Sequence, residues 1–220
     1  MSTAGAIQPF EFVGCLELRE MLGRAAWDER ELLAGIEDVP AGSISYHTRS
    51  YFLRSRYLAA PYPNDFATWA AIQVRDRVLG ERLAVVDLFD FADVEQLRGE
   101  LVGIIDHHLT TLQTVPRVDY GEPFHFMRST LIEVPTGIVA RNLREFRDAL
   151  ERVDTSAIYF HFYEAGRRSA ADPLAWLETE VGLADVAARL RRLNPYVTSL
   201  AGMRAQLLTA CDAVMGGSVQ

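Results

Sequence analysis

Two stretches 114 residues apart carry the same pattern: Ser43-Ile44-Ser45-Tyr46-His47-Thr48-Arg49 and Ala157-Ile158-Tyr159-Phe160-His161-Phe162-Tyr163. Isoleucine and histidine hold the same places in both. An internal repeat of this kind decides the fold, because each copy should form the same structural unit. Over residues 8–47 the 114-residue spacing aligns eleven identical pairs: Pro9/Pro123, Phe10/Phe124, Phe12/Phe126, Gly23/Gly137, Ala26/Ala140, Arg30/Arg144, Glu31/Glu145, Glu37/Glu151, Val39/Val153, Ile44/Ile158 and His47/His161.

The repeat continues beyond this stretch after a shortened loop. A spacing of 107 residues pairs Asp65 with Asp172 and Trp69 with Trp176. A spacing of 106 pairs Leu97-Arg98 with Met203-Arg204. We interpret the chain as a tandem duplication. The first repeat is residues 8–112, the second repeat is residues 122–214, and residues 113–121 link them.

Each repeat contains the sequence signals of several consecutive helices. Asp28-x-x-Glu31 and Asn142-x-x-Glu145 resemble capping boxes, in which a short polar side chain accepts an amide at a helix start. Asp65 and Asp172 are placed as N-caps of a later helix, each with a tryptophan one turn in as a packing anchor. A closing helix is expected over residues 94–112 and 200–214.

Strand signals are nearly absent from the sequence. The alternation of apolar and polar residues that marks a strand is confined to two short segments, Phe10–Phe12 and Phe124–Phe126. The sequence therefore predicts an all-α helical bundle. Two units of about four helices each would pack with approximate twofold pseudosymmetry.

Composition excludes several classes of function. The net charge of −8 argues against a nucleic-acid partner, since phosphate binding needs clustered positive charge. All 22 basic residues are arginine, which excludes a Schiff-base lysine and a P-loop. Two distant cysteines, the lack of a secretory signal and the lack of a long apolar run predict a cytoplasmic protein with no membrane partner.

The catalytic motifs with a recognisable spacing are missing, and the repeated histidines are what remains. His47 and His161 lie on inward helical stripes and could meet near the pseudosymmetry axis. Carboxylates beside them could then complete a metal site or an acid/base pair. The alternative is that both are core histidines that bond a neighbouring element. The candidate cluster is His47, Arg49, Asp65, His161, Glu164 and Asp172.

Three motifs together resemble an uncharacterised bacterial and archaeal family that is known only as a domain of unknown function. They are Ser-Ile-x-Tyr-His-Thr-x, Asn-Asp-Phe-x-x-Trp and, in the second unit, Tyr-x-His-Phe-x-Glu-Ala. The resemblance covers residues 10–208. In that family a second histidine often follows two residues after the first, where this chain has Arg49. The second copy also departs, with Ala171-Asp172-Pro173 in place of Asn64-Asp65-Phe66. The resemblance implies an architecture and no activity.

Two functions remain open at this point. The first is a non-catalytic module that binds a protein or a small molecule in the groove between its two repeats. The second is a metal-dependent or acid/base enzyme of hydrolase type centred on His47 and His161. The sequence identifies neither a cofactor nor a metal, and it leaves the oligomeric state open.

Overall fold

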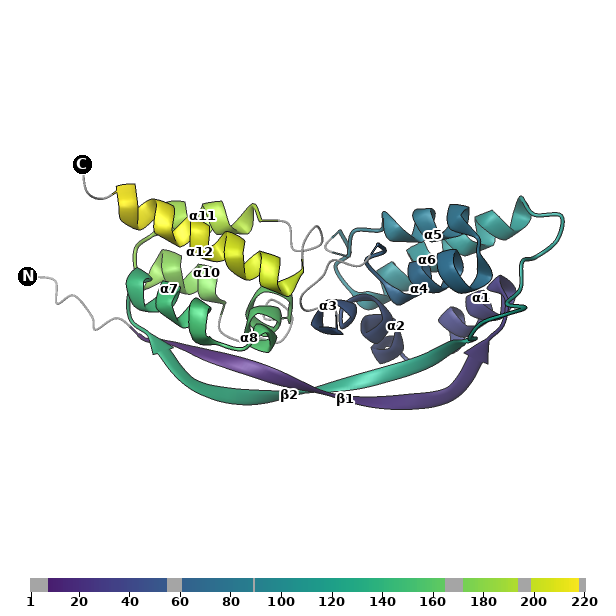
Figure 1. Ribbon diagram of the computed structural model, residues 1–220, viewed down its shortest axis with the longest axis horizontal. Coiled ribbons are helices and arrows are strands. Elements are labelled where there is room, and N and C mark those ends of the chain that lie inside the picture. Colours follow the sequence, from purple (N-terminus) through teal and green to yellow (C-terminus); the bar gives the residue numbers. More distant parts are fainter. Residues whose placement is uncertain (1–7, 55–60, 89, 165–171, 194–198, 218–220) are drawn as a thin grey trace, which may run out of the picture. The chain divides into compact units, whose positions relative to one another are not determined.

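A computed structural model describes residues 8–54, 61–88, 90–164, 172–193 and 199–217 of the chain (Figure 1). The chain divides into two compact units, each with its own core. Unit 1 contains residues 8–16 and the described residues from 131 onward. Unit 2 contains residues 17–54 and the described residues from 61 to 130.

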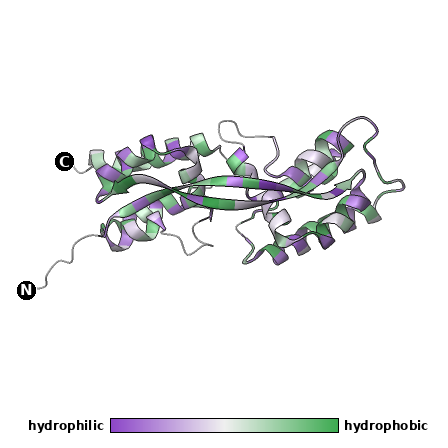
Figure 2. Cartoon of the chain, turned by 90° about the horizontal axis from the view of Figure 1, so that it is seen from below, coloured by the Kyte–Doolittle hydropathy of each residue, from purple (hydrophilic) through white to green (hydrophobic). Residues whose placement is uncertain are grey.

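Two long strands, β1 (Phe10–Ala26) and β2 (Phe124–Ala140), pair as a two-stranded antiparallel sheet. The predicted all-α helical bundle is therefore wrong, and the protein is of mixed α/β class. Beyond its first residues, β1 is rich in leucine, glutamate, arginine and methionine, which favour helices locally. Hydrophobic and hydrophilic residues are also interspersed along both strands (Figure 2). Pairing with β2, which is distant in the sequence, overrides the local helical preference of β1.

Each strand is divided between the two units. Unit 1 takes the start of β1, up to Leu16, and the end of β2, from Leu131; unit 2 takes the remaining parts. Each unit therefore combines the helices of one sequence repeat with the strand opening of the other. The compact units and the predicted repeats, residues 8–112 and 122–214, divide the chain at different places.

Both strands contain a glycine with positive φ near their ends. Gly23 has φ 69° and Gly137 has φ 70°. Glycine reaches this left-handed region without the steric cost that a β-carbon brings. This explains why glycine stands at the same place in both copies.

Helices of unit 2 follow β1 in the order of the chain, with a short π-helix, η1, among them. Their bounds are α1 (Glu29–Asp38), α2 (Ala41–Thr48), α3 (Tyr51–Arg54), α4 (Asp65–Trp69), η1 (Ala70–Val74), α5 (Arg77–Ala84) and α6 (Val94–Thr110). The core that they enclose with β2 includes Leu32, Ile36, Phe66, Leu79, Leu101, Ile105 and Phe126, all with 0% exposure.

Unit 1 repeats much of this order after β2. Its elements are α7 (Leu143–Arg152), α8 (Thr155–Tyr159), the π-helix η2 (Phe160–Glu164), α10 (Pro173–Thr179), α11 (Ala184–Arg191) and α12 (Leu200–Gly217). The strand openings complete the cores. The Phe10 ring lies 6.0 Å from that of Phe146, and the Phe124 ring stacks 5.1 Å from that of Phe66.

The two predicted caps at α1 and α7 are confirmed. Asp28 accepts the Glu31 amide and Asn142 accepts the Glu145 amide, both at 2.9 Å. The glutamates reach back one residue further than in a standard capping box. Glu31 accepts the backbone amide of Trp27, the residue before the cap. The closing helices, α6 and α12, also lie where the sequence places them.

The cap of α4 differs from the prediction. Asn64 is its N-cap and accepts the Ala67 amide at 2.8 Å, which leaves the Asp65 carboxylate available for other contacts. Asp172 does cap α10, as predicted. In the sequence, Leu58 and Ala165 continue the helical stripes of His47 and His161, and both lie outside the described residues.

The helical path of unit 2 breaks between η1 and α5. Arg75 ends η1 in the left-handed conformation, with φ 68°, and Asp76 then begins α5 as its N-cap. Gly182 occupies the equivalent place in unit 1, with φ 75°. Over the described ranges of the chain, no helix has the length and apolar character needed to cross a membrane.

Candidate functional site

His47 lies in α2 of unit 2 and uses both of its ring nitrogens. Nε2 accepts the backbone amide of Met127 at 3.0 Å, so this nitrogen carries no proton. Nδ1 therefore carries the proton and donates to Asp65 Oδ2 at 2.9 Å. The residue is 3% exposed, and burial lowers the pKa of the imidazole. A neutral imidazole in one fixed tautomer results.

His161 takes the equivalent part in unit 1. Its Nε2 accepts the backbone amide of Val13 at 2.9 Å, and the residue is 4% exposed. Val13 and Met127 are themselves 114 residues apart, so the same bond forms twice. Each histidine holds the strand opening that the other repeat supplies. The two histidines belong to different units, and a centre shared by both stays a prediction.

The repeated tryptophans add a second bond to each strand opening. Trp69 Nε1 donates to the carbonyl of Glu122 at 3.1 Å, and Trp176 Nε1 donates to that of Gln8 at 2.6 Å. Both rings are buried, as predicted for packing anchors. The tryptophans and histidines therefore explain much of the repeated pattern as structural.

The other candidate residues have separate roles. Asp65 accepts from His47 and also pairs with Arg54. Arg49 is buried at the C-cap of α2. Glu164 accepts the Tyr159 hydroxyl at 2.7 Å, and Asp172 accepts the Leu174 amide at 2.8 Å. From the predicted cluster, the structure brings His47 and Asp65 into direct contact.

A cavity of about 440 Å³ opens beside this contact in unit 2. Its wall is formed by one residue of β1, several from α2 to η1 and the start of β2. These are Arg19, Tyr46, His47, Arg54, Asp65, Thr68, Trp69, Gln73, Glu122, Pro123, Phe124, His125 and Met127. We call it the His47 pocket.

Two arginines and a tyrosine give the His47 pocket its chemistry. The Arg54 guanidinium lies over the Tyr46 ring, 4.2 Å from its centroid, and also pairs with Asp65. Arg19 is half exposed and donates to Glu17 through Nε at 2.8 Å. Within the described residues, the two terminal nitrogens of Arg19 have no hydrogen-bond partner. They can therefore donate to a bound molecule.

Sequence reasoning missed Arg19, Tyr46, Arg54 and His125, although a signal was present. The repeat was recognised by its identities, whereas Arg19, Tyr46 and His125 differ between the copies. Arg19 and His125 correspond to Glu133 and Glu11 at the 114-residue spacing. Tyr46, Thr68 and Gln73 correspond to Phe160, Ala175 and Glu180. The residues that both copies share stabilise the fold, and the residues that differ line the pocket of one copy.

Comparison with known proteins gives a family and one similar structure. Residues 7–212 match a family described as "Family of unknown function (DUF5752)". The structure of OrfY from Thermoproteus tenax is similar, with a TM-score of 0.76 and 25% sequence identity. The match covers 94% of this chain and 96% of that one. No curated protein matches the sequence.

Proposed function

We propose that this chain, which belongs to DUF5752, a family of unknown function, is a small-molecule binding module. The site is the His47 pocket of unit 2, and the ligand is a small organic anion with an apolar or aromatic part. The observation that carries this proposal is the reversal of charge between the copies. Arg19 and His125 line the pocket where the other repeat has Glu133 and Glu11.

The groups that would hold the anionic end are the donors on the pocket wall. Arg19 offers its terminal nitrogens, and the exposed His125 ring offers another donor. Guanidinium groups match carboxylates and phosphates with paired N–H donors. Asp65 does not oppose such a ligand strongly, because its carboxylate is already engaged by His47 and Arg54.

The apolar part of the ligand would meet aromatic surface. Tyr46, Trp69 and Phe124 line the same cavity. Binding sites for small molecules commonly combine such apolar walls with a few placed polar groups. Because both ring nitrogens of His47 are occupied, the pocket offers no free base at that residue, which favours binding over acid/base catalysis.

Ligand-observed NMR tests the proposal with three matched probes: phenyl phosphate, benzyl alcohol and benzylamine. We expect phenyl phosphate to bind, and the neutral and cationic probes to bind at least tenfold more weakly. The double variant Arg19→Glu/His125→Glu gives the pocket the charges of the other copy. It should weaken phenyl phosphate binding at least tenfold, which corresponds to about 1.4 kcal/mol.

A control variant carries one arginine-to-glutamate change away from the pocket. Arg144 is exposed on α7 of unit 1, so Arg144→Glu should leave binding unchanged. Binding of benzylamine in preference to phenyl phosphate would contradict the proposal. Equal binding by the double variant and the parent chain would contradict it too.

A further inference from the structure

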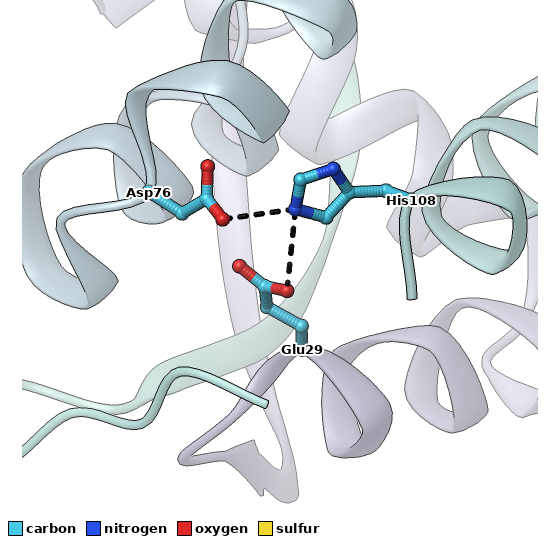
Figure 3. Close-up of side chains that lie close together, drawn as sticks. All are labelled: Glu29, Asp76 and His108. Atoms are coloured by element: carbon cyan, nitrogen blue, oxygen red, sulfur yellow. Dashed lines mark hydrogen bonds and ion pairs between the residues drawn. The ribbon is translucent and has the colours of Figure 1, made fainter. Parts of the chain in front are cut away.

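A second polar cluster lies in unit 2, formed by Glu29, Asp76 and His108 (Figure 3). His108 Nε2 lies 2.8 Å from Asp76 Oδ2 and 3.8 Å from Glu29 Oε2. One ligand atom from each residue lies within 4.8 Å of the others. Three helices supply them: Glu29 begins α1, Asp76 caps α5, and His108 is in the last turn of α6.

The cluster is buried, and several of its polar atoms have no partner. Glu29 is 0% exposed and His108 is 3% exposed. Among the described residues, neither Glu29 carboxylate oxygen has a hydrogen-bond partner, and neither has His108 Nδ1. A buried polar atom without a partner costs about 1–3 kcal/mol, and a buried charge costs more. The fold carries this cost at a position that faces two other ligand-type side chains.

The backbone positions Asp76 for this contact. Its Oδ1 accepts the Leu79 amide at 2.9 Å as the cap of α5, which directs Oδ2 toward His108. Arg75, immediately before it, adopts φ 68° although it is not a glycine. Such left-handed residues are uncommon and concentrate at functional sites.

The second repeat has apolar residues at the three equivalent positions. At the spacings of 114, 107 and 106 residues, Glu29, Asp76 and His108 correspond to Leu143, Leu183 and Val214. All three polar residues are apolar in the second copy. The helices α7, α11 and α12 form there without them. The fold of the unit therefore does not require the polar cluster.

We propose that Glu29, Asp76 and His108 bind one divalent transition-metal ion of the Zn²⁺ type. Imidazole and carboxylate are both ligands of Zn²⁺, whereas Mg²⁺ and Ca²⁺ prefer oxygen ligands throughout. Two carboxylates would balance the charge of the dication. His108 would bind through Nε2, the nitrogen that faces both carboxylates.

The spacing of the ligand atoms suits such an ion. Zn²⁺ binds nitrogen and oxygen at about 2.0–2.2 Å, so two tetrahedral ligands lie roughly 3.4 Å apart. The observed 2.8 Å and 3.8 Å lie on either side of that value. Small rotations of the side chains would therefore be sufficient. Three protein ligands leave a fourth position for water or another small ligand.

A shared proton is the alternative way to stabilise the cluster. Burial, with Asp76 and Asp28 nearby, raises the pKa of Glu29 to about 8. A neutral Glu29 would need no metal. The two possibilities differ in whether the chain binds Zn²⁺ tightly and with one ion per chain.

The test uses the full chain, with any histidine tag removed, after treatment with EDTA and dialysis. Isothermal titration with ZnCl₂ should give one site with a dissociation constant below about 1 μM. MgCl₂ and CaCl₂ should bind at least 100-fold more weakly. Zn²⁺ should also raise the melting temperature, because binding to the folded state alone stabilises it.

The variant Glu29→Leu/His108→Val reproduces the residues of the other repeat and keeps the Asp76 cap. It should fold at least as stably as the metal-free parent, since apolar replacement of a buried polar cluster is often neutral or stabilising. Its Zn²⁺ affinity should fall at least 100-fold. Asp106→Asn/His107→Gln removes similar ligands from exposed positions of the same helix and should change nothing.

Two results would overturn the proposal: no stoichiometric Zn²⁺ binding by the parent chain, or binding that survives in Glu29→Leu/His108→Val. If that variant does not fold, the visible spectrum of the Co²⁺-loaded parent decides instead. Intense tetrahedral bands would support the site, and a spectrum like that of free aqueous Co²⁺ would exclude it.

Discussion

The imidazole Nε2 of His47 accepts the backbone amide of Met127, a residue 80 positions further along the chain, at 3.0 Å. In the other unit His161 accepts the amide of Val13, which lies 148 positions earlier. The bond is the same in both units, but its direction along the chain is reversed. Each repeat thus depends on the other for the strand segment that completes its core. The histidine accepts a hydrogen bond from the backbone of that segment.

Replacing His47 should therefore destabilise unit 2. The change His47→Leu removes the acceptor of the Met127 amide and the donor to Asp65. We expect a loss of about 1–3 kcal/mol in the free energy of unfolding, measured with urea. His107 is exposed on α6, so His107→Leu is the matched control and should change stability by less than about 0.5 kcal/mol. Equal effects of the two changes would contradict the structural role.

The contribution of His47 should also depend on pH. Burial lowers the pKa of its imidazole in the folded chain, so the unfolded chain binds the proton more readily. Stability from this residue is therefore present above about pH 6.5, the ordinary histidine pKa, and is lost as the pH falls below it. The difference in unfolding free energy between the parent and His47→Gln should shrink between pH 7.5 and pH 5. A difference that grows on acidification would show that the sign is wrong.

The strained residue Arg75 offers a stabilising substitution. Its left-handed backbone costs a non-glycine residue about 1–2 kcal/mol, part of which glycine loses again through its greater freedom when unfolded. We expect Arg75→Gly to raise the unfolding free energy by up to about 1 kcal/mol. The reverse change at the equivalent place, Gly182→Ala, should lower it by a similar amount. Thermal denaturation of both variants checks the pair.

Gly35 is required for packing of α1 against β2. A β-carbon there would lie 2.1 Å from the ring of Phe126, so Gly35→Ala should destabilise by about 1–3 kcal/mol through overpacking. Gly99 lies exposed in α6, and a β-carbon there meets no atom within 4 Å. Gly99→Ala should therefore stabilise by about 0.5–1 kcal/mol, because alanine favours the helix. Urea denaturation should give opposite signs for these two variants.

The sequence predicts the helical part of this fold well, because its signals are local. The caps at Asp28 and Asn142 and the closing helix after Val94 depend on neighbouring residues alone. The long strands could not be predicted in the same way. β1 is stabilised by pairing with β2, which begins 98 residues after β1 ends. Its own leucine- and glutamate-rich segment does not favour a strand.

The candidate sites show the same limit. The sequence singles out His47 because it recurs, and recurrence selects residues that stabilise each unit internally. Glu29, Asp76 and His108 appear in one copy and are apolar in the other. They were missed because their meaning depends on a comparison between copies and on helix ends that lie far apart in sequence. Residues that differ between duplicated units are therefore a useful guide to chemistry.

Because each strand is divided between the units, the two units become complete at different times during synthesis. All of unit 2 has been made once Thr130 is added, whereas residues 8–16 need partners that come after residue 131. At about 5–20 residues per second, synthesis of residues 131–220 takes roughly 5–18 s. For that time the growing chain carries Phe10 and Phe12 without their core. The opening of β1 is therefore made well before the residues that complete its core.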